Sequence, residues 1–319
     1  TDGHVLTYSS SSGGIVLAAA GGGGGASDLN GLSDCKETTG TFGDSLYIGQ
    51  AGSNVTSNSR NNTTVGLTAG TAITDGQGCT FMGTYAGYAM TVGSFNTSLG
   101  YGSLQAEDDG SRNTAIGYEA LYQLNYSGWG RNTAVGSQAG RALTSNAFQN
   151  TIIGAEAANS QGSSITNCTV IGYGANPSAF NSQNQITLGN TSVGTLRCQV
   201  QTITSLSDER DKTNIEPIPY GLDFIDSLEP KRFVWDNRPE IAIEQDEEGN
   251  DIEVEFYSAN KGKEDIGFIA QDLLEVDDNF LNLVHTDNPD KLEASYGRLI
   301  PVLVQAIKEL KAEIELLKS

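Results

Sequence analysis

A short hydrophobic pattern repeats along the first two-thirds of the chain. An aliphatic residue followed by glycine recurs nine times, at intervals of 17 to 19 residues. Threonine stands three residues before seven of these glycines, and a small residue stands three residues after them. The glycines are Gly49, Gly66, Gly83, Gly100, Gly117, Gly136, Gly154, Gly172 and Gly189.

This pattern predicts one short strand per repeat. Thr-x-aliphatic-Gly alternates with a period of two residues and is rich in β-branched side chains. We expect one aliphatic residue per repeat to point inward, where only stacking on neighbouring repeats buries it. Glycine then supplies a backbone conformation or a close approach that other residues lack. The sequence therefore predicts a mainly β fold, with a β-solenoid shaft over residues 45–202.

A second series lies four residues before each glycine and consists mostly of asparagine. Its members are Ser45, Asn62, Cys79, Asn96, Asn113, Asn132, Asn150, Cys168 and Gln185. Stacked asparagine side chains can hydrogen-bond from coil to coil. The cysteines Cys35, Cys79, Cys168 and Cys198 show no metal-ligand spacing, so we expect reduced, packed thiols, no metal and no cofactor.

Each coil has little interior of its own, because it contributes only about one aliphatic and one small residue. Small structures gain burial by oligomerisation, so we expect several chains to pack around a common axis. The segments NTAIGYEAL at 113–121 and NTAVGSQAG at 132–140 resemble the head repeats of trimeric autotransporter adhesins and shaft repeats of phage fibres. This resemblance implies a trimeric, left-handed parallel β-roll.

Charge divides the chain into two modules. Residues 1–206 contain 11 acidic and 6 basic side chains, whereas residues 207–319 contain 28 and 12. The acidic balance argues against nucleic acid or an anionic membrane surface as a partner. No apolar run reaches the roughly 18–20 residues of a membrane-spanning helix. We expect a glycine-rich linker or attachment segment at 1–44, the shaft at 45–202 and an α+β module at 203–319.

The C-terminal module is predicted to mix strands and helices. A strand is expected at Arg232–Trp235, an acidic turn at 247–251 and an alternating segment at Ile252–Tyr257. A Gly-Phe-Ile-Ala-Gln box at 267–271 leads into a helix, and a last helix is expected over 296–318.

The last helix carries apolar residues at alternating spacings of four and three, as in a coiled-coil seam. They are Tyr296, Ile300, Leu303, Ile307, Leu310, Ile314 and Leu317. The alternative is an amphipathic helix packed on its own domain. Isoleucine at a and leucine at d favours parallel dimers, whereas the shaft repeats imply a trimer.

Three motifs in this module resemble the intramolecular chaperone of endosialidases and phage tail spikes, peptidase family S74. They are Ser207-Asp208-Glu209-Arg210-Asp211-Lys212 followed by Thr213-Asn214-Ile215, the 267–271 box, and Tyr296 through Ile300-Pro301 to Leu310. The resemblance covers about residues 203–319. It implies that the module drives homotrimer assembly and then cuts the Leu206–Ser207 bond, with Ser207 as nucleophile and Lys212 as base.

A serine–lysine pair is chemically suited to this cleavage. A hydroxyl becomes a nucleophile when a base takes its proton, and lysine serves once burial lowers its pKa. A bond held beside its nucleophile needs no substrate pocket. The activity would be that of a single-turnover serine endopeptidase without an external substrate. The competing interpretation of Ser-Asp-x-Arg is a helix cap with solvated charges. Ser205 has the wrong spacing to Lys212, and His4 and His285 have no recognisable catalytic partner.

The whole pattern predicts the distal part of a virion tail fibre, made in the host cytoplasm. Its expected partners are two further copies, a host-cell surface receptor (a glycan or an outer-membrane component) and other tail proteins on its N-terminal side. No signal peptide is recognisable. The alternatives are a bacterial trimeric surface adhesin and a retained, non-cleaving assembly cap.

A glycan-cutting tail spike is a further alternative that would require paired carboxylates. The cluster Glu107, Asp108 and Asp109 is read as a solvated turn instead. Several aromatic residues are either sugar-stacking platforms or pack between coils, with packing favoured. They are Tyr85, Tyr101, Tyr122, Tyr126 and Trp129.

Overall fold

The structure is a computed structural model that forms two compact units, Thr1–Asn190 and Thr191–Ser319. It describes residues 4–9, 14–19, 35–38, 45–49, 58–160, 162–199, 203–245, 251–257 and 260–319. The glycine run at 21–25, within the predicted linker or attachment segment at 1–44, and most of the predicted acidic turn at 247–251 lie outside these residues.

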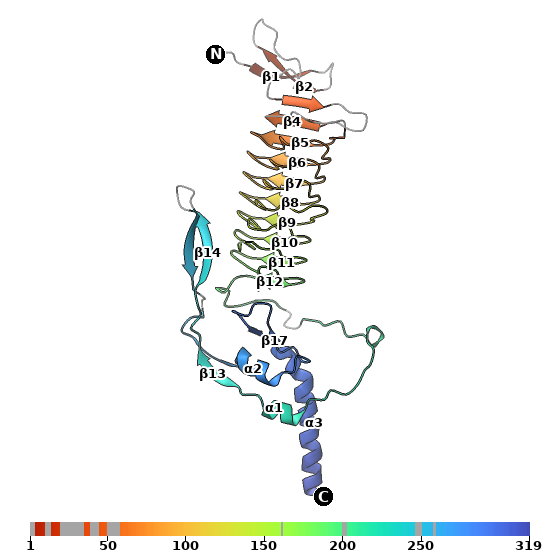
Figure 1. Cartoon of the computed structure of the whole chain (residues 1–319), viewed down its shortest axis with the longest axis vertical. Helices are drawn as coiled ribbons and strands as arrows, with labels where there is room; N and C mark the ends of the chain where they lie inside the picture. Colours follow the sequence, from red (N-terminus) through yellow and green to blue (C-terminus); the bar gives the residue numbers. More distant parts are fainter. Residues whose placement is uncertain are drawn as a thin grey trace. The chain divides into compact units, whose positions relative to one another are not determined.

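The N-terminal unit is a parallel β-solenoid of about eight turns (Figure 1), which confirms the predicted shaft architecture. Strands β4 to β12 pair in parallel and in sequence order, and β3 joins β4 antiparallel. A separate hairpin pairs β1 (His4–Ser9) with β2 (Gly14–Ala19). The sheet strands are β3 (Cys35–Thr38), β4 (Ser45–Gly49), β5 (Thr63–Gly66), β6 (Thr80–Met82), β7 (Thr97–Leu99), β8 (Thr114–Ile116), β9 (Thr133–Val135), β10 (Thr151–Ile153), β11 (Thr169–Ile171) and β12 (Ile186–Leu188).

The aliphatic residue before each glycine does not point into the solenoid, so that expectation was wrong. In β5 to β11 the middle residue of the Thr-x-aliphatic segment is buried, while the residues on either side of it face outward. Successive residues of a strand face opposite sides. Because the asparagine just before the strand points inward, the residue two positions later does so as well. The middle residues are Thr64, Phe81, Ser98, Ala115, Ala134, Ile152 and Val170.

The remaining core of the coils comes from the turns between strands. The small residues three positions after the glycines are buried, as their regular spacing suggested. Leucines of the connecting turns, such as Leu104, Leu121 and Leu143, fill the space between successive coils. One chain therefore buries two apolar clusters of its own, one around Phe81 and one around Ile152, and the outward aliphatic residues belong to neither.

Stacked glycines allow the coils to approach closely. Gly117 has a φ of +137° and Gly136 a φ of +139°, a region that side-chain-bearing residues rarely adopt. A Cβ atom on Gly117 would lie 2.2 Å from the carbonyl oxygen of Gly136 in the next coil. Both reasons expected for glycine, the conformation and the contact, hold at this position.

The asparagine series hydrogen-bonds from coil to coil as predicted. The amide N of Asn132 donates to Oδ1 of Asn113 at 3.1 Å, and the amide N of Asn150 donates to Oδ1 of Asn132 at 3.1 Å. The Nδ2 group of Asn132 also donates to the carbonyl oxygen of Ala147 at 3.0 Å. Since these side chains are buried, each one satisfies backbone groups that water does not reach.

Two cysteines continue the series as buried free thiols, which confirms their structural interpretation. Cys79 Sγ lies 3.4 Å from the carbonyl oxygen of Gly93, and Cys168 Sγ lies 3.4 Å from that of Ser182. Burial raises the pKa of Cys79 to about 11, so this thiol stays protonated and unreactive at neutral pH.

Glu107 is buried inside the solenoid, so a solvated turn is wrong for this residue. One carboxylate oxygen accepts from the amide N of Gly110 at 2.9 Å, and the other accepts from that of Tyr126 at 3.3 Å. Burial raises the pKa of Glu107 to about 7, and the charge of Asp109 adds to this shift. The other two acids bond to neighbouring coils, Asp108 to Thr91 and Asp109 to Ser127.

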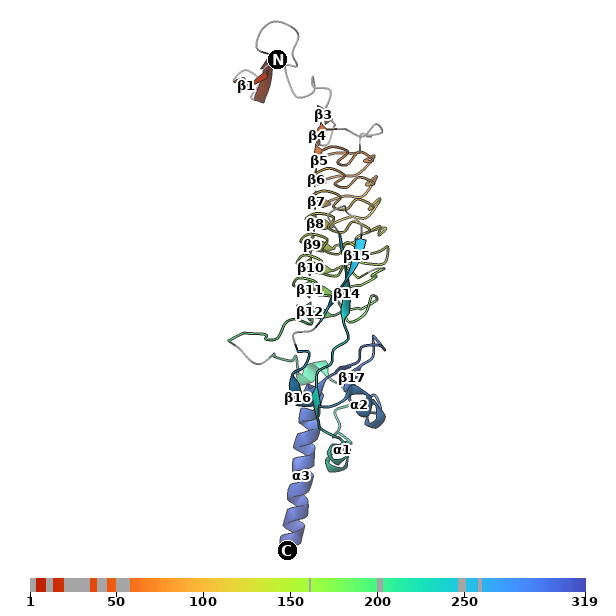
Figure 2. The ribbon, with the colours of Figure 1, turned by 90° about the vertical axis from the view of Figure 1, so that its left-hand side faces the viewer.

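The C-terminal unit is a small α/β structure that ends in a long helix (Figure 2). Its core contains Leu273, Leu281, Leu283, Leu299 and Val302. Three antiparallel strand pairs form, β13 with β16, β14 with β15 and β17 with β18. The elements are η2 (Glu209–Asp211), α1 (Leu222–Asp226), β13 (Lys231–Val234), β14 (Glu240–Gln245), β15 (Asp251–Phe256), β16 (Glu264–Gly267), α2 (Ala270–Val276), β17 (Val284–His285), β18 (Glu293–Ala294), η3 (Tyr296–Arg298) and α3 (Leu299–Lys318).

No helix within the described residues is long and apolar enough to cross a membrane. The same part of the chain contains no group of three or more His, Cys, Asp or Glu side chains that could hold a metal ion.

Replacing Asn132 with alanine is expected to destabilise the solenoid. The change leaves the buried amide of Asn150 and the carbonyl of Ala147 without partners, at about 1–3 kcal/mol for each unsatisfied group. Chemical denaturation followed by circular dichroism measures the effect. Asn146→Ala is the matched control, because Asn146 is exposed at a turn of the same repeat. Equal midpoints for the two variants would contradict a stabilising role of the series.

Glu107→Gln is expected to change how stability depends on pH. Burial raises the pKa of this carboxyl from its ordinary value of 4.5 to about 7 in the folded chain. The contribution of the protonated group is therefore complete below about pH 4.5 and is lost as pH rises through 7, by at most about 1.4 kcal/mol per pH unit. The glutamine variant, which does not ionise, should match the wild type near pH 5 and exceed its stability at pH 8. Unfolding curves across this range test the prediction, and parallel pH profiles would refute it.

Candidate functional site

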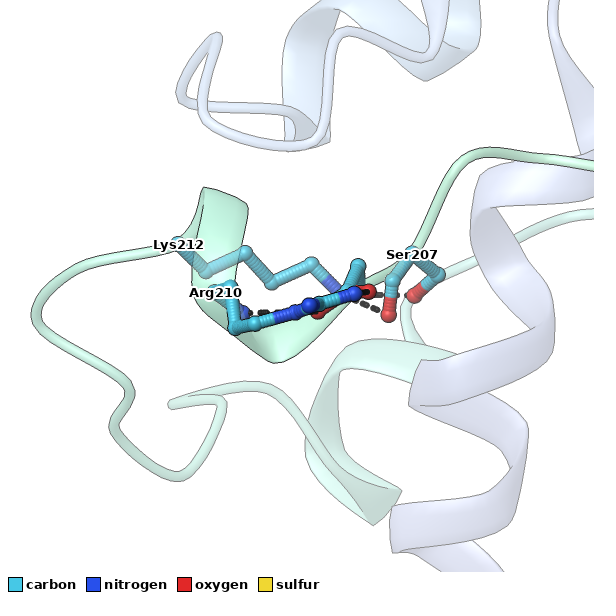
Figure 3. A network of polar contacts seen from close by, with 4 residues as sticks. Ser207, Arg210 and Lys212 are labelled. Atoms are coloured by element: carbon cyan, nitrogen blue, oxygen red, sulfur yellow. Dashed lines mark hydrogen bonds and ion pairs between the residues drawn. The ribbon is translucent and has the colours of Figure 1, made fainter.

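The structure brings Ser207 and Lys212 into direct contact (Figure 3). Lys212 Nζ lies 2.6 Å from Ser207 Oγ and 3.1 Å from the carbonyl oxygen of Ser207. The two residues that the S74 resemblance nominates are therefore hydrogen-bonded, with the amine placed to exchange a proton with the hydroxyl.

The short helix η2 creates this contact. The Asp208 side chain caps it by accepting from the amide N of Arg210 at 2.9 Å, and Arg210 also forms an ion pair with Asp208 at 2.6 Å. The pKa of Asp208 is lowered by hydrogen bonds from the Arg210 side chain and backbone. The turn then carries Lys212 back toward Ser207. The cap interpretation is thus correct for Asp208, and it leaves the Ser207 hydroxyl available to Lys212.

The peptide bond before Ser207 is accessible. Leu206 is 100% exposed, and residues 203–208 form no helix or strand. Ser207 and Lys212 are also exposed in the single chain. A lysine acts most readily as a base where it is shielded from water. The single chain therefore supplies the contact between the two groups and leaves the lysine open to water.

The second and third motifs meet at Tyr296. Its hydroxyl accepts from the amide N of Phe268 at 3.1 Å, and the two aromatic rings pack edge to face at 5.5 Å. A Cβ on Gly267 would lie 2.8 Å from this hydroxyl, so glycine makes room for the tyrosine. The contact joins the 267–271 box to the start of the last helix, although the two are separated by about 28 residues in the sequence.

Helix α3 is also joined to α1. Glu309 accepts from the amide N of Leu222 at 2.6 Å and from Gln305 Nε2 at 2.8 Å, and these bonds lower its pKa. Gly221 lies against the carboxylate, because a Cβ there would sit 2.1 Å from Glu309 Oε2. Sequence reasoning missed this cap. Gly221 and Glu309 are far apart in the sequence, so no local pattern predicts that they meet.

Apart from Tyr296, which contacts Phe268, the residues of the predicted coiled-coil seam do not form the face through which α3 packs on its own unit. Helix α3 packs on its own unit through a different face, formed by Leu299, Val302 and Ala306. The seven seam residues are 41–87% exposed. The helix therefore has two apolar faces, one of which holds it to the unit while the other is open.

Other apolar side chains of this unit are uncovered. Ile266 is 78% exposed and Val234 is 55% exposed, both on the β13–β16 pair. They line an open cavity of about 960 Å³ that also includes Phe233, Trp235 and Tyr296. His285 is exposed in β17, and the side chain of His4 lies outside the described residues.

A family model matches the segment that contains both Ser207 and Lys212. The model described as chaperone of endosialidase, peptidase S74, matches residues 207–284 and so begins at Ser207. No curated protein and no solved structure matches the chain. Residues 207–284 of the C-terminal unit are therefore similar to the chaperone-of-endosialidase family. Together with the solenoid before it, this match supports a tail-fibre-like protein with an assembly chaperone.

Proposed function

We propose that the chain is the distal, host-recognising part of a virion tail fibre. Its C-terminal unit drives homotrimer assembly and then releases itself by cutting the Leu206–Ser207 bond. The observation that carries this proposal is the 2.6 Å contact of Lys212 Nζ with Ser207 Oγ beside a fully exposed peptide bond, at the start of the family match.

The cleavage step follows from these atoms. Lys212 takes the proton of the Ser207 hydroxyl, and Oγ attacks the carbonyl carbon of Leu206. The C–N bond breaks, the amine of Ser207 receives the proton, and Leu206 becomes an ester on Oγ. Water then hydrolyses the ester, which leaves a carboxylate on Leu206 and a new N-terminus at Ser207.

Two exposed apolar tracks support association with further copies. In the solenoid, the outward aliphatic residues form one track with one side chain per coil, including Met82, Leu99, Ile153 and Ile171 at 39–43% exposure. In the C-terminal unit, the seam of α3 forms the other. Regular apolar rows of this kind lose water contact when like surfaces pack together.

In this proposal, association with further copies activates the Ser207–Lys212 pair, which is exposed in the single chain. Packing of further copies around Ser207 and Lys212 would exclude water from the reacting pair. Cleavage would then follow assembly, so that the chaperone is released only after the chains are in register. A repetitive shaft needs such alignment, because identical coils can pair one repeat out of step.

Cleavage is tested by intact mass and a denaturing gel on the full-length chain. The wild type should split into residues 1–206 and 207–319. Ser207→Ala and Lys212→Ala should each slow the reaction at least about 10³-fold, because each removes one member of the reacting pair. Ser205→Ala is the matched control and should cleave normally. A wild-type trimer that stays intact would identify the unit as a retained assembly cap.

Assembly is tested through the α3 seam. Leu303→Glu and Ile307→Glu place charges on the open apolar face and should convert trimers to monomers in size-exclusion chromatography with light scattering. Lys308→Glu lies next to the seam and serves as the control. If assembly precedes cleavage, both seam variants should also remain uncut. Trimers of unchanged stability in the seam variants would exclude this helix as an assembly surface.

A further inference from the structure

One corner of the solenoid carries exposed aromatic and arginine side chains in register on successive coils. Phe95, Arg112 and Arg131 occupy the position just before the inward asparagine, and all three have a positive φ of 52–65°. Trp129 lies beside them and is 59% exposed, while Phe95 is 58% exposed. We call Phe95, Arg112, Trp129 and Arg131 the arginine–aromatic corner.

The side chains of this corner stack on one another. The Arg112 guanidinium lies 4.8 Å from the centre of the Trp129 ring and 5.8 Å from that of Phe95. The Arg131 guanidinium lies 4.9 Å from the Trp129 ring centre. Stacking on an aromatic face orients a guanidinium and leaves its N–H edge available for other partners.

The backbone beneath the corner is held firmly. The amide N of Phe95 donates to the carbonyl oxygen of Gln77 at 2.7 Å, and that of Arg112 donates to Ser94 at 3.0 Å. Each bond links one coil to its neighbour. A surface fixed in this way presents its side chains with little loss of backbone freedom on binding.

The two arginines have no acidic partner within the part of the chain that the structure describes. Arg141, by contrast, pairs with Glu119 at 2.6 Å. Two unpaired cations side by side are unusual in a chain with a net charge of −21. A guanidinium fork matches a carboxylate or phosphate group, so the corner has the charge and the donor geometry for an anion.

We propose that the arginine–aromatic corner binds an anionic saccharide, with the acidic group on Arg112 and Arg131 and the apolar face of a sugar ring on Trp129 or Phe95. Aromatic faces pack well against the C–H groups of a ring, and the arginines supply the specificity for charge. The corner is an open surface that follows the coil axis, which suits a polymer more than a small molecule. Repetition of the site on assembled copies would strengthen a weak contact through avidity.

This inference rests on the proposed host-recognition function and gives it a site. It distinguishes the exposed aromatic residues that stack on arginines from those that stack on one another. Tyr101 and Tyr118, for example, stack on each other at 5.7 Å, and Tyr85 packs edge to face against Tyr101. That tyrosine ladder supplies a control for the exposed aromatic surface alone.

The test measures binding of the full-length protein to immobilised polymers by biolayer interferometry. The probes are polygalacturonate, which carries carboxylates, phosphorylated dextran, neutral dextran and polyglutamate. The protein should bind at least one anionic polysaccharide, more tightly than polyglutamate and without binding neutral dextran. The acidic polymer that binds identifies the acidic group. Trp129→Ala, which removes the stacking face, and the double change Arg112→Ala with Arg131→Ala, which removes the charge-assisted contacts, should each weaken binding at least about tenfold.

Control variants distinguish a failure of the saccharide site from a failure of assembly or cleavage. Arg112→Lys keeps the charge without the fork and should bind more weakly than the wild type, whereas Tyr101→Ala should bind normally. Oligomeric state and cleavage are recorded on the same samples. An assembled, self-cleaving protein that binds neither anionic polysaccharide would overturn the site alone. If a corner variant fails to assemble, this surface forms contacts between copies and is not a saccharide site. If the protein binds polyglutamate as tightly as the polysaccharides, the binding is non-specific charge attraction.

Discussion

Coil-to-coil hydrogen bonding through the buried asparagine series is the constraint on which the solenoid depends. Each side chain completes the backbone bonding of the next coil, so Asn113, Asn132 and Asn150 must lie directly above one another. This register places glycine over glycine, where no Cβ fits. Once these two rows are aligned, the inward and outward directions of every strand residue follow from the alternation of the β-strand.

The same alternation decides which apolar side chains remain outside. With the core filled by the middle strand residues and the turn leucines, the aliphatic residue before each glycine faces outward on every coil. Helix α3 repeats this arrangement, because one apolar face packs on its own unit while the seam stays open. A single chain therefore buries enough to define its fold and exposes regular rows that fit the proposed self-association.

The Ser207–Lys212 pair is held together by its own short segment and is exposed to solvent in the single chain. A six-residue segment is enough to bring Lys212 to Ser207, because the Asp208 cap turns the chain between them. In the proposed cleavage, further copies that cover the site would shield the lysine from water. In this proposal, assembly controls the timing of cleavage through solvent exclusion, and the chain needs no separate regulatory element.

The sequence by itself determined the solenoid, its repeat length and the asparagine series, and the resemblance of its motifs to the S74 family nominated Ser207 and Lys212. Each of these depends on residues close in sequence or repeated at a fixed period. The direction of the aliphatic row, the burial of Glu107, the Glu309 cap on α1 and the stacking of Arg112 on Trp129 were decided only by the tertiary structure. These features depend on which surfaces meet when coils and distant segments pack, and a period of 17 to 19 residues does not specify which side of a strand faces the core.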